Sequence, residues 1–317
     1  MEVKKLALAA KAAVLSVSVF AAAQEESEKT SQFEWEMGNG ISYGETSIMS
    51  TEFGLAFDSK YMSYGLVDNR DPIMTPSASA TFFDFLTFEI EAIFDLTTQG
   101  RKDGRTNRGG KYMELDPGAY LSWSFSPEDH EALPTTIDVS FGYFYEYHPR
   151  SMHGKECGWA NTHYLWAEIG LPDLWLEPLL YIERDLKRDN GTYASLELGH
   201  TFSLIDSDDG EDDPVLALRP SVAQGVGNTQ RVRGYLWLYD AATDEDRPLD
   251  HGGLMDTCVK CELTWTVCDW LSLSGYVAYY DYIFDGNMRD AAREYTGRAS
   301  DDNSYHFVAG LSLTASF

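Results

Sequence analysis

The last thirteen residues of this 317-residue sequence, YHFVAGLSLTASF, constrain the fold more than any other segment. Every second side chain from Phe307 to Phe317 is apolar, and most of the residues between them are small or polar. Alternation with a period of two places the two sets on opposite faces of a β-strand. The pattern predicts the closing strand of a membrane β-barrel, with the terminal strand of a soluble β-sandwich as the alternative.

The apolar face of the same strand is also a candidate assembly signal. A terminal aromatic residue preceded by apolar residues at alternate positions resembles the signal by which the barrel-assembly machinery recognises its clients. The residues that carry this pattern are Phe307, Leu311, Leu313 and Phe317. We therefore expect the barrel-assembly machinery and outer-membrane lipid to be partners of this chain.

The N-terminal residues predict export. Lys4 and Lys5 are followed by an apolar run, residues 12–20, and by three alanines that end at Ala23. A positive start, a short apolar core and a small-residue cleavage site are typical of a secretory signal peptide. No run of about 18 apolar residues occurs elsewhere, so we expect no transmembrane helix. The expected divisions are a signal peptide (1–23), an N-terminal periplasmic segment or extra strand (24–50) and an outer-membrane barrel (51–317).

The composition excludes one class of partner and favours a folded chain. The formal net charge is −27, with 51 acidic residues against 24 basic ones. Nucleic acids and anionic lipid surfaces attract Lys and Arg, so we expect no nucleic-acid partner. The 14% of aromatic residues and 44% of hydrophobic residues argue against a disordered chain.

Alternating segments recur along the whole chain and account for the fold class. Runs of about ten residues match a tilted strand that crosses a bilayer, whereas strands of soluble proteins average five or six. We count twelve such segments: 53–60, 77–82, 86–96, 114–125, 137–147, 162–171, 175–185, 193–204, 215–224, 255–267, 271–284 and 304–317.

The connections between these segments alternate in length. Brief turns such as 83–85, 171–173 and 268–270 alternate with long polar loops such as 225–254 and 285–303. Short turns at one end and long loops at the other are typical of an outer-membrane barrel. The sequence therefore predicts an all-β, antiparallel transmembrane β-barrel of about twelve strands with both termini periplasmic. Residues 33–43 and 233–239 also alternate, the latter as a strand or a loop hairpin, so ten or fourteen strands are alternatives.

Residues 53–97 resemble the opening hairpins of the TorF-type porin family. In that family an alternating strand ends in a Ser-x-Tyr run, followed by a Gly, a short polar stretch and a Pro. The matching positions here are Ser59, Tyr61, Gly65 and either Pro72 or Pro76. The family's Arg-Gly pair is replaced by Tyr64-Gly65. The resemblance implies an outer-membrane β-barrel and leaves the substrate open.

The strand faces expected to point inward carry a large excess of acids. Only Lys60, Arg219 and Lys260 clearly oppose them. The acids are Asp58, Glu89, Glu91, Asp95, Glu114, Asp116, Asp138, Glu146, Glu168, Glu177, Glu183, Glu197 and Glu262.

Carboxylates along a narrow water-filled lumen concentrate cations and repel anions. The expected function is therefore a porin-like channel for passive diffusion of small cationic or neutral solutes. In the alternative, the acids only solvate the interior or pair with basic residues of the loops. This second interpretation allows an alternative function, a plugged structural or surface-interaction barrel without transport activity.

No catalytic pattern stands out, so we expect no enzyme activity. The His-x-Ser-Asn-Gly run of barrel phospholipases is absent, and Asp250-His251 resembles the acid–histidine pairs of omptin-like proteases by composition alone. We also expect no metal and no cofactor. One polar loop does hold several residue types that bind transition metals, without a recognised spacing: Glu146, His148, His153, Glu156, Cys157 and His163.

The Cys258-x-x-Cys261 pair has the spacing of half a zinc site, but it lies within an alternating run. Residues three apart on a strand face opposite sides, so these two sulfurs cannot share a metal. We expect Cys258 to face the lumen and Cys261 to face lipid. The acidic run DSDDGEDD, residues 206–213, lacks the spacing of a calcium loop.

The closing-strand interpretation predicts the effect of a short deletion. Removal of residues 314–317 takes away the last apolar positions of the strand that must seal the barrel. We expect the shortened protein to be degraded before assembly, as measured by the yield of heat-modifiable protein in the outer membrane. Normal assembly of the shortened chain would contradict this interpretation.

Overall fold

The computed structural model describes most of the predicted barrel. Those residues belong to one compact unit, Ser47–Phe317. The predicted signal peptide (1–23), the rest of the N-terminal segment up to residue 48 and the alternating run 33–43 lie outside the described residues. The described ranges are 49–96, 111–128, 130, 132–148, 161–206, 214–240, 245–297 and 303–317.

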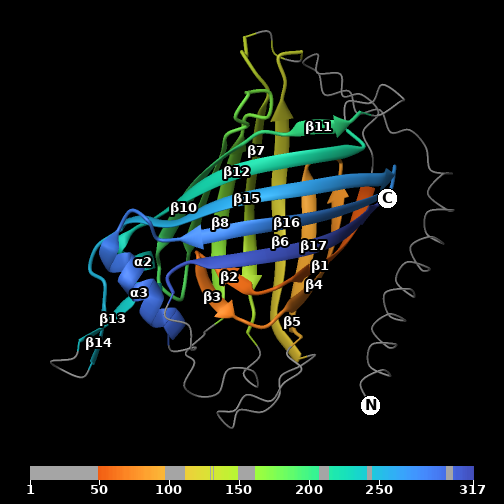
Figure 1. Ribbon diagram of the computed structural model, residues 1–317. Coiled ribbons are helices and arrows are strands. Elements are labelled where there is room, and N and C mark those ends of the chain that lie inside the picture. Colours follow the sequence, from red (N-terminus) through yellow and green to blue (C-terminus); the bar gives the residue numbers. More distant parts are fainter. Residues whose placement is uncertain are drawn as a thin grey trace, which may run out of the picture. The chain divides into compact units, whose positions relative to one another are not determined.

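Twelve long strands form a closed antiparallel barrel (Figure 1). Each of these strands pairs with the one before and the one after it in the chain, including β10 with β12, and the pairing of β1 with β17 closes the ring. The prediction of a twelve-stranded antiparallel barrel is confirmed. The strands are β1 (Met49–Asp58), β4 (Ile73–Phe82), β5 (Leu86–Asp95), β6 (Lys111–Phe125), β7 (Ile137–Glu146), β8 (Thr162–Gly170), β9 (Leu179–Asp185), β10 (Thr192–Gly199), β12 (Leu216–Gly227), β15 (Gly253–Cys268), β16 (Leu271–Asp281) and β17 (His306–Ser316).

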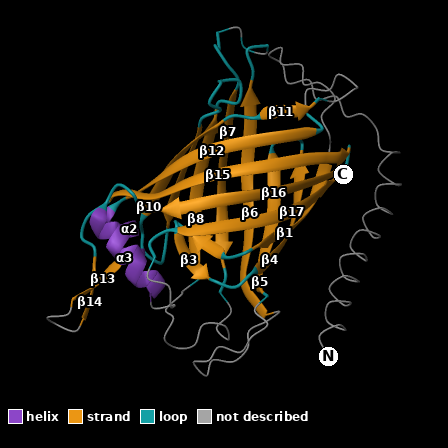
Figure 2. Ribbon diagram, viewed as in Figure 1, coloured by secondary structure: helices purple, strands orange, loops and turns teal. Residues whose placement is uncertain are grey.

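Shorter elements lie in the connections between the long strands (Figure 2). They are β2 (Tyr61–Ser63), β3 (Leu66–Asn69), β11 (Phe202–Ile205), α2 (Thr229–Tyr235), β13 (Trp237–Asp240), β14 (Glu245–Pro248) and α3 (Gly286–Gly297). The run 233–239 forms the end of α2 and then most of β13, which pairs with β14. It is therefore part of a loop hairpin, one of the two alternatives that its alternation allowed.

Several predicted strands have different limits in the structure, and two of the predicted segments include a turn. The segment 175–185 becomes a strand only at Leu179, because residues 171–178 fold as a turn in which the Glu177 amide donates to the Leu174 carbonyl at 2.8 Å. Glu177 has a positive φ of 40°, which is incompatible with a strand, so β9 begins only after it. The segment 193–204 divides into β10 and the short strand β11.

The outer surface of the barrel is apolar, as the alternation predicts. Along β17, Phe307 and Leu311 are 65% and 62% exposed, whereas Val308 between them is 4% exposed. Exposed Phe, Leu, Ile, Val and Trp side chains recur on the other strands, including Phe88, Leu165 and Val277. In a closed ring the backbone of every strand is hydrogen-bonded to its neighbouring strands, so no strand edge is left unpaired. An apolar exterior is compatible with the hydrocarbon core of a bilayer. The barrel is therefore built to span a bilayer.

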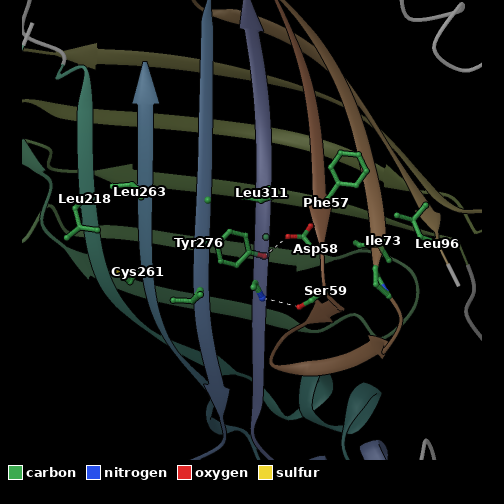
Figure 3. Close-up of a pocket in the computed structure, with 15 residues that line it drawn as sticks. Phe57, Asp58, Ser59, Ile73, Leu96, Leu218, Cys261, Leu263, Tyr276 and Leu311 are labelled. Carbon is green, nitrogen blue, oxygen red and sulfur yellow. Dashed lines mark hydrogen bonds between the residues drawn. The ribbon is translucent and has the colours of Figure 1, made fainter. Parts of the chain in front are cut away.

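A depression of about 560 Å³ lies across the seam between the first and last strands. Its lining includes outward-facing Phe57, Leu263 and Leu311 (Figure 3). Among the residues that the structure describes, no helix is long and apolar enough to cross a membrane.

The strand register predicts which side chains meet lipid and which meet water. In a cysteine-free background, we expect Leu311→Cys and Phe88→Cys to react with a lipid-soluble thiol reagent. Ser312→Cys and Glu89→Cys should react with a water-soluble one, because successive residues of a strand face opposite sides. Reversed labelling would mean that the register is displaced by one residue.

Candidate functional site

One part of the interior wall is acidic and carries no described neutralising partner. Asp58 lies on β1, Glu89 and Glu91 on β5, and Asp116 on β6, where it stands opposite Glu91. Asp58 accepts a hydrogen bond of 2.6 Å from the Tyr276 hydroxyl (Figure 3). Among the described residues, no Lys, Arg or His lies within 4.0 Å of the carboxylates of Glu89, Glu91 or Asp116. We call these four residues the acidic wall.

The facing strands carry acids that are matched by bases. Arg219 on β12 binds Glu197 and also lies 3.3 Å from Glu177. On β15, the Lys260 ammonium lies 3.1 Å from the Glu262 carboxylate. These residues are half-buried and reach water, so the pairs screen charge on this side of the interior. The interior is therefore electrostatically lopsided.

Glu177 was expected on a strand, but in the structure it lies in the turn before β9. Burial acts to raise the pKa of this carboxyl. Hydrogen bonds from the amide and hydroxyl of Thr201, together with Arg219, outweigh burial and lower the pKa below its usual value. Through its contacts with Thr201 and Arg219, the Glu177 carboxylate links this turn to the residue before β11 and to β12.

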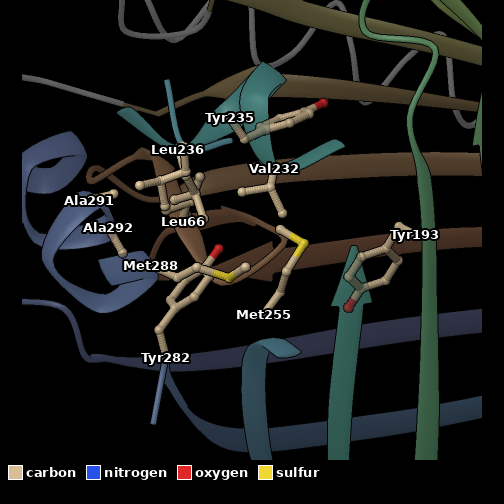
Figure 4. Close-up of a cluster of buried hydrophobic side chains, with 11 residues drawn as sticks. Leu66, Tyr193, Val232, Tyr235, Leu236, Met255, Tyr282, Met288, Ala291 and Ala292 are labelled. Carbon is tan, nitrogen blue, oxygen red and sulfur yellow. The ribbon is translucent and has the colours of Figure 1, made fainter. Parts of the chain in front are cut away.

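At the opposite end of the barrel, three connections pack together into a buried cluster (Figure 4). Leu66 comes from β3, Val232 and Tyr235 from α2, and Met288 and Ala291 from α3. Strand residues Tyr193 and Met255 also belong to the cluster. The complete set is Leu66, Tyr193, Val232, Tyr235, Leu236, Leu249, Met255, Tyr282, Met288, Ala291 and Ala292. We call it the outer cluster, because it lies at the end that carries the long loops.

Arg231 fastens α2 to the barrel wall beside the outer cluster. Its side chain has no exposed surface, and its guanidinium lies 3.0 Å from Glu183 of β9 and 3.5 Å from Asp189. The guanidinium also lies over the ring of Tyr64, 4.7 Å from its centroid, and the Tyr64 hydroxyl donates to Glu183. A buried arginine requires carboxylates and aromatic faces of this kind to offset lost hydration.

Four of the acids expected to line the lumen are buried near this end. Asp95, Glu114, Glu146 and Glu183 are all less than a tenth exposed. Glu114 accepts a hydrogen bond of 3.1 Å from Tyr61, and Glu146 accepts one of 2.9 Å from Arg188. These contacts place Glu114, Glu146 and Glu183 in a packed polar network. Asp138 and Glu168 are half-buried inward-facing residues of β7 and β8, and Lys60 lies between β1 and β2.

Glu114, Glu146 and His148 are the one described group with metal-ligand geometry. One ligand atom from each lies within 4.8 Å of the others, and all three side chains are buried. The His148 ring contacts both carboxylates, with Nδ1 3.6 Å from Glu114, and the Arg188 guanidinium lies 2.9 Å from Glu146. The group therefore already has a cation of the chain, Arg188, at one of its carboxylates.

The other suspected metal and catalytic residues are not brought together. His163 packs against Tyr143 and Tyr145, away from that group, and residues 153, 156 and 157 lie outside the described part of the chain. Cys261 is exposed and Cys258 is half-buried, as expected for opposite faces of β15. Asp250 lies 3.4 Å from Arg233, while His251 lies 3.7 Å from Asp285.

Comparison with known proteins finds distant likenesses only. No protein-family model matches the chain, and no curated protein matches it. Among solved structures, an outer membrane channel from Pseudomonas putida F1 is 10% identical with a TM-score of 0.44, over 90% of this chain and 100% of that chain. OprB from Pseudomonas putida is 13% identical with a TM-score of 0.32, over 80% and 61% of the two chains. OmpT from Vibrio cholerae is 9% identical with a TM-score of 0.30, over 85% and 98%. Likenesses this low identify no family, and we transfer no function from them.

The buried Arg231 predicts a strong and specific effect on stability. Arg231→Met leaves the Glu183 carboxylate buried without its cation, which should lower the free energy of unfolding by about 3–5 kcal/mol. Urea unfolding of the detergent-solubilised protein measures the change. The matched control is Arg184→Met on the same strand as Glu183, since Arg184 is exposed and bonds only Thr192 among the described residues.

We expect less than about 1 kcal/mol for the control, as for other exposed substitutions. Adding Glu183→Gln to Arg231→Met should recover part of the loss, because one of the two carboxylates that Arg231 contacts is then replaced by a neutral amide. Equal losses in Arg231→Met and Arg184→Met would show that the buried ion pair does not fasten α2.

Proposed function

We propose that this protein is an outer-membrane channel for passive diffusion of small solutes, with an acidic lumen that prefers cations. The observation that supports the proposal is the acidic wall. Glu89, Glu91 and Asp116 face the interior of a closed barrel with no described base within 4.0 Å. Fixed carboxylates in confined water lower the electrostatic energy of a passing cation and raise that of an anion.

The acids of this wall keep accessible surface inside the barrel, which supports the proposal. Glu91 is exposed although it faces inward, and Asp58, Glu89 and Asp116 each keep some accessible surface. The acids at the opposite wall are held by Arg219 and Lys260, so the unmatched charge is concentrated on one side. Small cationic and neutral solutes are the class that such a surface admits most readily.

An outer-membrane location follows from the architecture within this proposal. A barrel with an apolar exterior requires a bilayer, and bacterial barrels of this design occupy the outer membrane. Membrane lipid and the barrel-assembly machinery are then the partners, with Phe307, Leu311, Leu313 and Phe317 as the assembly signal. All four side chains are exposed on the outside of the closing strand or at its end. The signal peptide at residues 1–23 stays a prediction.

The outer cluster supports a second candidate, a plugged barrel without transport. The cluster joins α2, α3 and β3 into one buried core at the end with the long loops. A plugged barrel and a channel differ in one observable, because only an open water path gives discrete current steps in a planar bilayer. No catalytic role is proposed, since Asp250 and His251 contact different partners.

The acidic wall predicts the selectivity of the open channel. Replacing Glu89 and Glu91 by Gln should lower the cation-to-anion permeability ratio by about two- to fivefold, equal to roughly 0.4–1 kcal/mol. The measurement is the reversal potential across a salt gradient in a planar bilayer. The effect should shrink at 1 M salt, where the Debye length falls to about 3 Å.

The matched control removes two charges outside the interior. Asp84 and Asp269 are exposed residues of short turns, and the double change to Asn should leave the permeability ratio nearly unchanged. A wild-type channel that prefers anions would contradict the proposal. So would a Glu89→Gln, Glu91→Gln channel with unaltered selectivity.

A further inference from the structure

Three aromatic side chains form a continuous patch on the interior wall. Tyr120 on β6, Trp166 on β8 and Tyr181 on β9 all face inward. The ring centroids of Tyr120 and Trp166 lie 5.5 Å apart, and those of Trp166 and Tyr181 lie 6.2 Å apart with a 28° angle between the planes. We call these three residues the aromatic patch. Tyr181 also packs against the outer cluster, so the patch borders it.

The intervening strand β7 contributes a glycine that makes room for the indole of Trp166. Gly142 stands opposite both Tyr120 and Trp166 in the strand register. A Cβ atom at Gly142 would lie 2.6, 2.6 and 2.7 Å from Cε2, Nε1 and Cζ2 of Trp166. These distances place the Nε1–Cζ2 side of the indole against Gly142, where any side chain would displace the ring. The glycine therefore makes room for Trp166 between Tyr120 and Tyr181.

Carboxylates flank the patch on both sides. Glu168 lies two residues after Trp166 on the same face of β8 and stands opposite Tyr181. Glu89 lies over Gly118, two residues before Tyr120, where a Cβ would be 2.9 Å from the Glu89 carboxylate. In the described part of the chain, no basic side chain lies within 4.0 Å of either carboxylate. Both keep some accessible surface.

The described arginines inside the barrel lie over other aromatic rings. Arg231 lies over Tyr64, Tyr164 and Tyr235, and Arg188 lies over Tyr235. Within the described ranges, no arginine or lysine covers a ring of the aromatic patch. The patch therefore combines the best type of cation–π acceptor, a Trp ring, with two carboxylates and no cation from the described residues.

We propose that the aromatic patch, with Glu89 and Glu168, binds organic cations that carry apolar substituents, such as quaternary ammonium compounds. The apolar groups of such a cation contact the indole face, its charge is attracted by the ring quadrupole, and the two carboxylates supply long-range attraction. A neutral sugar can also stack on aromatic rings, but it gains nothing from the flanking charges. The proposal names a solute class for the proposed channel and rests on that function for transport, though not for binding.

Equilibrium binding to the full-length protein in nonionic detergent at low salt tests the proposal. The probes are choline and its neutral isostere 3,3-dimethylbutanol, which has the same shape without the charge, and glucose represents neutral sugars. We expect choline to bind at least about tenfold more tightly than either neutral compound. Trp166→Leu should weaken choline binding by about three- to tenfold, and Trp166→Phe by less.

Trp123→Leu is the matched control, because Trp123 lies on the lipid-facing side of β6 and is exposed there. It should leave choline binding unchanged. Glu89→Gln combined with Glu168→Gln should also weaken choline binding without touching the rings, and this keeps the test valid if a Trp166 variant fails to fold. Heat-modifiable migration reports folding for each variant.

Several outcomes would overturn the proposal. These are equal binding of choline and its isostere, glucose binding that depends on Trp166, or equal effects of Trp166→Leu and Trp123→Leu. The channel and the patch can fail separately. A cation-selective current without choline binding removes the patch and keeps the channel. Choline binding by a barrel that carries no current keeps the patch and removes the channel.

Discussion

Closure of the strand ring is the constraint on which the rest of the structure depends. Inside a bilayer no water is present to bond an exposed strand edge, so an open sheet is not viable. The chain meets this requirement by pairing β1 with β17 from Glu52–Ser316 to Asp58–Gly310, and β10 with β12. Once the ring is closed, the alternation along each strand separates an apolar outside from a polar inside. The acidic wall and the aromatic patch exist because of that separation.

The interior has two regions with different physical character. Near the long loops, the outer cluster resembles the core of a soluble protein, with Arg231 held by Glu183 and by aromatic faces. The strands beside it carry carboxylates with no described counter-charge. Burial of ion pairs stabilises the first region only while the partners stay together. The accessible carboxylates of the second region are those that the proposed channel would use to attract cations. In that proposal, stabilising contacts and solute contacts lie in different parts of one interior.

Period-two alternation was enough to predict most of the barrel from the sequence. Strand β5 begins at Leu86 as expected, and it ends at Asp95, one residue early. The turn before β9 was missed, because Leu176 and Glu177 continue the alternation although Glu177 takes a positive φ. The outer cluster could not be predicted either. Its residues come from short loop elements, and the pairing of Arg231 with Glu183 depends on the three-dimensional course of those loops. The aromatic patch was missed because Trp166 needs Gly142 on the neighbouring strand, a relation that only the register reveals.

The assignment of side chains to the inside or the outside of the barrel depends on the register between β1 and β17. An engineered disulfide between these two strands measures that register directly. Thr51 and Phe317 exchange both backbone hydrogen bonds, so Ala56 and Ser312, five residues along, form a non-hydrogen-bonded pair. Such pairs have Cα atoms about 4.5 Å apart, within the range that a disulfide spans. In a background without native cysteines, Ala56→Cys with Ser312→Cys should form an intramolecular disulfide in the membrane-inserted protein. A disulfide in Phe57→Cys with Ser312→Cys, and none in the first pair, would contradict the account.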